Sequence, residues 1–236
     1  MRPLFRFKQF SMTDEHCGMR ITTDSVLLGA WASPASADCR VADIGTGCGI
    51  IALMLAQRMP SAAIDAVECD ADACLDARAN FDASPWAARL ALHNVPFENF
   101  EAGTTYGLIV CNPPFFIENL RSPNSARAVA RHAGTLSFGA LARRAREILA
   151  PDGHLAVILP SAHDSATIAD AAIAGLSPRR HCLVKPCPDA APIRSLWEFS
   201  ARDGSCEETE LAIRTADGRY SDDYISLTHD FHPQFS

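Results

Sequence analysis

The sequence predicts an α/β fold in which a mostly parallel sheet of seven strands carries helices on both faces. From Arg40 onward, short β-branched or apolar runs alternate with Ala-rich helical stretches, which is typical of successive strand–helix units. The helical stretches also end at helix-closing residues, because Pro60, Pro151 and Gly175 follow them. Together these observations predict a doubly wound, Rossmann-like sheet that ends in an antiparallel hairpin.

The individual elements follow from these runs. Strands are predicted at residues 41–44, 63–68, 90–93, 106–111, 155–159, 181–184 and 195–201. Helices are predicted at residues 24–32, 50–58, 71–83, 138–149 and 162–174, with a further one at 221–229. Since no break in composition separates two cores, we expect a single domain over residues 1–236, with residues 1–39 as an N-terminal extension.

The charge distribution narrows the class of partner. The 236 residues carry a formal net charge of −7, which argues against nonspecific coating of nucleic acid. Between Glu118 and Glu147, however, no acidic residue occurs. The arginines of that stretch are Arg121, Arg127, Arg131, Arg143, Arg144 and Arg146. We predict a basic patch for an anionic partner, with a solvated helix face as the alternative for residues 143–146.

Location and metal content are predicted from what the sequence lacks. Every apolar run is shorter than the roughly 18 residues needed to cross a bilayer, and the N-terminus MRPLFRFKQF has no signal-peptide pattern. We therefore expect a cytoplasmic protein without membrane contact. The nine cysteines show no CxxC spacing, so neither a disulfide framework nor a metal site is predicted. The sequence does not set the oligomeric state, for which a monomer is the working expectation.

The run VADIGTGCGI places three glycines where a strand meets a helix. Gly45, Gly47 and Gly49 allow a sharp turn and a close approach of ligand to backbone. Glu68 ends the next strand, where a carboxylate can accept hydrogen bonds from both hydroxyls of a ribose. This loop alone also suits NAD. Asp43, however, puts a negative charge where it would repel a pyrophosphate and attract a sulfonium. We therefore predict S-adenosylmethionine as the cofactor. A helix cap is the alternative role for Asp43.

The fourth predicted strand ends in LIVCNPPFF, at the sheet edge where ligands of open α/β folds bind. An aromatic or amide amine is a poor nucleophile because its lone pair is delocalised. If the Asn112 side-chain oxygen and the Pro113 carbonyl both accept hydrogen bonds from the amine, its nitrogen can become tetrahedral. Phe115 can stack on an extruded base, and Phe116 is a candidate for the same surface or for the core. The loop therefore predicts N-methylation.

These motifs resemble a known group of enzymes. D-I-G-T-G-C-G together with N-P-P-F looks like the amino-methyltransferases of the Rossmann class. More closely, FRFKQFSM, MRITTDSVLLGAWA, SPWAARL and NPPFF are similar to the tRNA adenine N6-methyltransferases that modify the adenosine 3′ of the anticodon in valine tRNA. The resemblance covers nearly the whole chain. It implies S-adenosylmethionine-dependent methylation of adenosine N6 in a tRNA, without a metal ion.

The resemblance also implies roles for residues of the N-terminal extension. Those that would line the cofactor or substrate pocket are Lys8, Gln9, Thr23 and Asp24. Asp24 would lie near the amino-acid end of S-adenosylmethionine, although Thr23 and Asp24 also suit a helix start. One departure concerns the cofactor's adenine: relatives usually carry an acidic residue shortly after the third strand, and this sequence has Pro96 there. His93, Asn94 or a backbone carbonyl would then replace the missing carboxylate.

Other substrates remain as alternatives. The same loop handles amide nitrogens, as in N5-methylation of a glutamine in a translation release factor, but such enzymes carry a helical domain before the glycine loop and only forty residues precede Val41. A DNA adenine methyltransferase would need a target-recognition region longer than residues 117–135. Methylation of an adenine in rRNA is a further alternative. A non-catalytic RNA-binding protein would have no reason to retain both Asn112 and the glycine loop.

Overall fold

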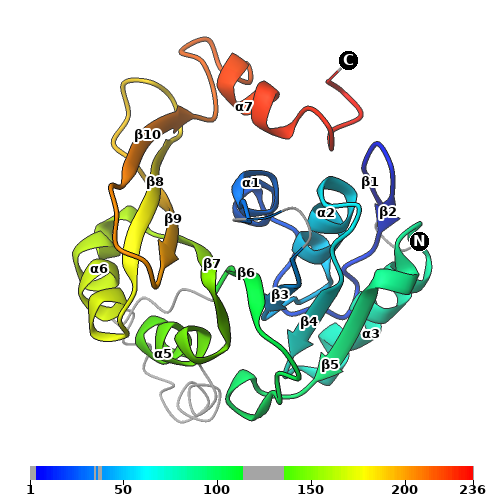
Figure 1. Cartoon of the computed structure of the whole chain (residues 1–236). Coiled ribbons are helices and arrows are strands. Elements are labelled where there is room, and N and C mark those ends of the chain that lie inside the picture. Colours follow the sequence, from blue (N-terminus) through cyan, green and yellow to red (C-terminus); the bar gives the residue numbers. More distant parts are fainter. Residues whose placement is uncertain (1–3, 35, 37–38, 114–135, 236) are drawn as a thin grey trace, which may run out of the picture.

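A twisted central sheet organises the fold (Figure 1). The computed structural model describes residues 4–34, 36, 39–113 and 136–235, and within these ranges eight strands form the sheet in the order β10-β8-β9-β7-β6-β3-β4-β5. Neighbouring strands are parallel except that β9 runs antiparallel to both β7 and β8. The strands are β3 (Val41–Ile44), β4 (Ile64–Glu68), β5 (Leu90–Asn94), β6 (Tyr106–Cys111), β7 (Leu149–Leu159), β8 (Ser177–Lys185), β9 (Arg194–Ser200) and β10 (Glu207–Ala212).

The sheet confirms the predicted mostly parallel architecture but has one strand more than the seven expected. All seven predicted segments are strands, and β8 and β9 form the antiparallel hairpin. The additional strand is β10, whose sequence EETELA lacks the alternation of apolar and polar residues that is typical of a half-buried strand. It forms the sheet edge beside β8, where charged side chains face solvent and only Leu211 of these residues is buried. Edge strands commonly carry charge, so the pattern that identifies buried strands does not detect this one.

Helices cover both faces of the sheet. In Figure 1, α1 and α2 lie inside the arc of the sheet, and α5 and α6 lie outside it. Alternate residues of β6 separate the two sides: Leu108 and Val110 belong to the core under α1 and α2, whereas Ile109 and Cys111 belong to the core under α5. The helices are α1 (Thr23–Trp31), α2 (Ile50–Arg58), α3 (Ala71–Asp82), α5 (Phe138–Ile148), α6 (Asp164–Ile173) and α7 (Asp222–Thr228). All six predicted helices are confirmed, with end shifts of a few residues.

The N-terminal segment is built into the core and does not merely extend from it. Thr22 caps α1 in a capping box with Ser25, and every residue from Ser25 to Trp31 is buried. Gly29 lets α1 approach α2 closely, because a Cβ there would lie 2.8 Å from the Met54 sulfur. Arg58 of α2 donates to the carbonyls of Gly29 (3.0 Å) and Ala32 (2.7 Å). Residues 22–32 are therefore an integral layer of the domain.

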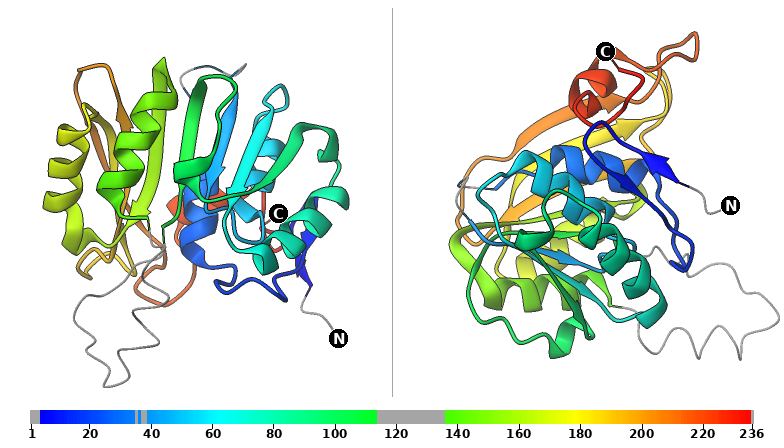
Figure 2. Two further views of the ribbon diagram at one scale, coloured as in Figure 1. Left: turned by 90° about the horizontal axis from the view of Figure 1, so that it is seen from below. Right: turned by 90° about the vertical axis from the view of Figure 1, so that its right-hand side faces the viewer.

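Segments close to the two ends of the described chain lie side by side on the α1 side of the molecule (Figure 2). A short hairpin of β1 (Phe5–Arg6) and β2 (Ser11–Met12) lies beside the segment after α7, and the Lys8 amide donates to the Phe231 carbonyl at 2.9 Å. Across the described ranges, every helix is too short or too polar to span a bilayer.

Candidate active site

Three neighbouring strand ends bring the main predicted site residues together. Ile44, the last residue of β3, pairs with Val67 of β4 and with Cys111 of β6. The residues that follow these three, Gly45, Glu68 and Asn112, therefore occupy adjacent positions at the carboxyl edge of the sheet, where strands are about 4.8 Å apart. This is the edge at which open α/β sheets bind ligands.

The glycine loop has the backbone that the sequence predicts. Gly45, Gly47 and Gly49 have φ values of 68°, 56° and 89°, a left-handed conformation that residues with a Cβ rarely adopt. A Cβ on Gly45 would have no atom within 4 Å, so this part of the loop faces open space. A Cβ on Gly49 would instead collide with the ring of Phe81 on α3. Gly45 offers its backbone to a ligand, whereas Gly49 is required for packing.

Asp43 organises the loop from beneath. Its side chain is fully buried, and Oδ2 accepts hydrogen bonds from the Thr46 hydroxyl (2.6 Å) and the Ala52 amide (3.0 Å) in the first turn of α2. Burial raises the pKa of Asp43 to about 7, although these two hydrogen bonds oppose the shift. The Oδ2 contacts fit the helix-cap alternative, whereas the buried Oδ1 has no hydrogen-bond partner among the described residues. A direct interaction of Asp43 with a sulfonium stays a prediction.

Glu68 is fixed beside the loop by hydrogen bonds and has lone pairs left to accept more. Its Oε2 accepts from the Gly47 amide and its Oε1 from the Asp70 amide, both at 2.9 Å. Because each carboxylate oxygen has two lone pairs, one on each oxygen is left for hydroxyl groups of a ligand. The side chain of Asn94 donates to the Glu68 carbonyl at 2.9 Å, whereas His93 bonds to Asp65. Of these two alternatives for the missing carboxylate, Asn94 is therefore the one beside Glu68.

Asn112 has a buried side-chain oxygen without a partner among the described residues. Its side chain is buried, with 9% of its surface exposed, and among the described residues Oδ1 has no hydrogen-bond donor. Buried polar atoms are satisfied in the great majority of cases, so an orphaned acceptor at a ligand-binding edge indicates a donor on a ligand. Pro113 is also buried. The remaining candidates of this region, Phe115, Phe116, Arg121, Arg127 and Arg131, lie outside the described residues, and their roles stay predictions.

The predicted N-terminal site residues separate into two groups. Asp24 accepts a hydrogen bond from Arg194 Nε at 2.7 Å, and Arg194 is the first residue of β9, which begins at the carboxyl edge because Ser195 pairs with Leu159. Thr23 is exposed in the first turn of α1. Lys8 is exposed in the N-terminal hairpin, where its Nζ lies 3.5 Å from His229 Nε2. The structure thus places Asp24 at the carboxyl edge of the sheet, beside the start of β9, and Lys8 against the C-terminal segment; their roles in ligand binding stay predictions.

Part of the basic stretch has a structural role. Arg144 on α5 donates to Glu147 (2.6 Å) and to the Phe100 carbonyl (2.7 Å), so its guanidinium joins the helix to the loop before β6. This agrees with the helix-face alternative for residues 143–146. All nine cysteines lie in the described part of the chain as free thiols. In the same part, no three His, Cys, Asp or Glu side chains gather as metal ligands would.

Comparisons with known proteins agree with this geometry. The family model described as methyltransferase small domain matches residues 22–174. A tRNA1(Val) (adenine(37)-N6)-methyltransferase of Parabacteroides distasonis is 41% identical over 233 residues, covering 98% of this chain and 98% of the relative. A protein of the same name from Tolumonas auensis is 40% identical, again with 98% of each chain covered.

Solved structures share the fold at low identity. A predicted O-methyltransferase from Agrobacterium tumefaciens superposes with a TM-score of 0.67 at 18% identity, over 88% of this chain and 96% of that chain. A glycopeptide N-methyltransferase complexed with S-adenosyl-L-methionine gives a TM-score of 0.56 at 11% identity, over 78% and 100%. The chain therefore belongs to the methyltransferase small domain family and, within it, to the group of the tRNA1(Val) (adenine(37)-N6)-methyltransferases.

Proposed function

We propose that the protein transfers the methyl group of S-adenosylmethionine to the exocyclic N6 amine of an adenosine in tRNA. The observation that carries the proposal is the buried Oδ1 of Asn112, which has no partner within residues 4–34, 36, 39–113 and 136–235 and lies at the strand end next to the open glycine loop. An acceptor in this position suits an NH2 group presented beside a cofactor. Family membership and the names of the curated relatives support the same activity.

The residues around the loop fit S-adenosylmethionine. Gly45 faces open space where a ligand can approach the backbone. Glu68 has free lone pairs for the two ribose hydroxyls, and its carboxylate is held in place by the Gly47 and Asp70 amides. Asp24, paired with Arg194, is the candidate for the amino-acid end of the cofactor. When bound, the cofactor supplies an electrophilic methyl group on a sulfonium.

Asn112 and Pro113 would activate the acceptor nitrogen without a strong base. Their oxygens accept the two N–H groups, which favours a tetrahedral nitrogen whose lone pair points toward the methyl group. Because proline fixes φ and Asn112 is buried, both acceptors are set before reaction, so little reorganisation is needed in the transition state. Phe115 would stack on the extruded adenine.

The proposed target is the adenosine 3′ of the anticodon in valine tRNA, since the curated relatives are named for adenine 37 of tRNA1(Val). Such a substrate agrees with a cytoplasmic protein. A glutamine of a release factor and an adenine of rRNA present NH2 groups of similar chemistry, so they are the competing substrates.

The test is transfer of labelled methyl from S-adenosylmethionine to valine tRNA, to rRNA and to a release factor, each offered separately. Mass spectrometry of the products should find N6-methyladenosine in the tRNA. A valine tRNA in which that one adenosine is replaced by guanosine serves as the matched control and should take no label. Label that appears in protein glutamine or only in rRNA would overturn the proposal.

A further inference from the structure

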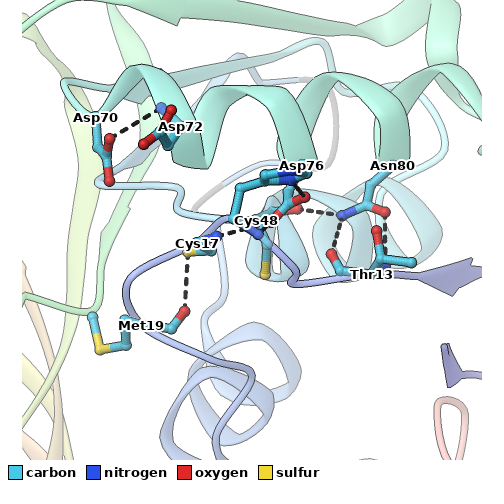
Figure 3. Close-up of polar contacts among 9 residues, drawn as sticks. Thr13, Cys17, Met19, Cys48, Asp70, Asp72, Asp76 and Asn80 are labelled. Atoms are coloured by element: carbon cyan, nitrogen blue, oxygen red, sulfur yellow. Dashed lines mark hydrogen bonds and ion pairs between the residues drawn. The ribbon is translucent and has the colours of Figure 1, made fainter. Parts of the chain in front are cut away.

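The segment that leads into α1 is tied to the glycine loop by one side chain of α3. Asn80 is buried, and its Nδ2 donates to the carbonyls of Thr13 and Cys48, both at 2.8 Å (Figure 3). Its Oδ1 accepts from the Thr13 amide at 2.9 Å. Because Cys48 belongs to the glycine loop, a single amide group connects Thr13 to that loop.

Asp76, one turn earlier on α3, holds the other end of the same segment. Its Oδ2 accepts from the amides of His16 (2.7 Å) and Cys17 (2.9 Å), and its Oδ1 bonds to His16 Nδ1 at 2.8 Å. Residues four apart on a helix share a face, so Asp76 and Asn80 can both form hydrogen bonds with the backbone of residues 13–17. Burial raises the pKa of Asp76, but the hydrogen bonds from His16 and Cys17 outweigh it and hold the pKa below its usual value.

The anchored segment borders the loop on which the cofactor is proposed to bind. A Cβ on Gly47 would lie 3.2 Å from the Cys17 sulfur, so the thiol is packed against that glycine. The Gly47 amide in turn donates to Glu68, the proposed ribose acceptor. Cys17 is partly exposed and donates to the Met19 carbonyl at 3.0 Å. The segment from Thr13 to Cys17 and the Glu68 side chain thus contact the same turn of the loop.

We infer that Asp76 and Asn80 are positioning residues for cofactor binding, because they fix Thr13–Cys17 against the glycine loop as a wall of the cofactor site. The inference rests on the proposed function for the identity of the ligand. Neither side chain needs to touch the cofactor, since their hydrogen bonds end on the segment and on the Cys48 carbonyl. Their contribution should therefore appear in cofactor affinity and leave the chemical step unaltered.

The variants Asn80→Ala and Asp76→Ala test this. We expect each to weaken binding of S-adenosylhomocysteine, measured by calorimetry, by about tenfold to a hundredfold, since each variant loses three hydrogen bonds. The KM for S-adenosylmethionine should rise correspondingly, with kcat at saturating cofactor and the KM for tRNA changed by less than about threefold. Asp76→Asn keeps an acceptor for both backbone amides, so it should restore near wild-type affinity.

A second measurement reports the position of the segment Thr13–Cys17 through the reactivity of Cys17. N-ethylmaleimide labelling of Cys17, located by peptide mass spectrometry, should be slowed by S-adenosylhomocysteine in the wild type. It should become faster in Asn80→Ala with or without that ligand. Cys206, which precedes β10, serves as the internal reference and should label at an unchanged rate. Tyr106→Phe removes a different buried hydrogen bond, to Asp65, and controls for a general loss of stability.

The outcomes separate the two proposals. If the wild type does not bind S-adenosylhomocysteine, the proposed function fails. If the wild type binds it and Asn80→Ala and Asp76→Ala bind it equally well, the inference about the wall is wrong. It is also wrong if Tyr106→Phe and Asn80→Ala have the same melting temperature and the same reduced affinity for S-adenosylhomocysteine. An Asp76→Asn variant that binds this ligand as weakly as Asp76→Ala would contradict it too.

Discussion

Replacing Asn112 by Ala should remove activity without removing stability. In the reaction, its Oδ1 would accept a hydrogen bond that strengthens as the amine nitrogen becomes tetrahedral. Loss of one preorganised acceptor of that kind typically lowers turnover on the order of a hundredfold to a thousandfold. Cofactor affinity should change little, because the proposed ribose acceptor is Glu68 and its contacts are to Gly47 and Asp70.

The effect of the same substitution on stability follows from the Oδ1 atom, which has no hydrogen-bond partner in the part of the chain that the structure describes. A buried acceptor without a donor costs the folded protein about 1 to 3 kcal/mol. Removing it from the substrate-free protein relieves that cost, which offsets the packing lost with the rest of the side chain. The melting temperature should therefore stay within about 4 °C of the wild type, or rise, since 1 kcal/mol corresponds to roughly 2–4 °C for a chain of this size.

Three measurements decide the matter: single-turnover methyl transfer to tRNA, calorimetry with S-adenosylhomocysteine, and thermal unfolding of the substrate-free protein. Asn112→Asp keeps an acceptor oxygen and should retain more activity than Asn112→Ala. Normal turnover in Asn112→Ala would refute the proposed chemistry. A fall in melting temperature of 10 °C or more would show instead that the Asn112 amide supports the fold.

Other substitutions test the remaining roles. Glu68→Ala should weaken S-adenosylhomocysteine binding by about 1 to 3 kcal/mol in calorimetry, and an unchanged affinity would remove Glu68 from the ribose site. Asp43 has a pKa raised from 3.8 to about 7 by burial, so its charged form is disfavoured in the folded state. As pH rises from about 4 to 7, the wild type should lose up to about 4 kcal/mol of stability relative to Asp43→Asn, with no further loss above that range; parallel stability curves in denaturant titrations would contradict this. Reversal of Arg127 and Arg131 to Glu should weaken tRNA binding and flatten its salt dependence, whereas an unaltered salt slope would assign both to a solvated surface.

The predictable parts of the site are those encoded by neighbouring residues. A strand followed by glycines, or by Asn112 and Pro113, can be recognised from a short stretch of sequence. Its end can then be placed at the ligand-binding edge, because the carboxyl ends of parallel strands meet there. Glu68 could be found for the same reason. The pairing of Asp24 with Arg194 could not, since 170 residues separate them and no motif surrounds Arg194.

The sequence leaves a ligand contact and a helix cap as alternatives for Asp43, and it gives no indication of the contacts of Asn80. An acidic residue at a strand end gives no indication of whether it faces a ligand or the helix below it, and the Ala52 amide that binds Asp43 is nine residues away. Asn80 lies in the last turn of α3, where the sequence alone predicts an exposed amide. Its partner Thr13 is 67 residues distant, so the contact becomes visible only when the fold is known.

The meeting of the two chain ends on the α1 side bears on how the protein folds as it is made. The segment around Phe231 is synthesised long after α1, yet the Lys8 amide bonds to the Phe231 carbonyl and α7 packs on α1. Strand β9 must likewise enter between β7 and β8 after both have been translated. Helix α2 covers part of α1 early, but the part of α1 that α7 covers stays exposed until α7 has emerged, and this surface is open to aggregation or to chaperones during translation.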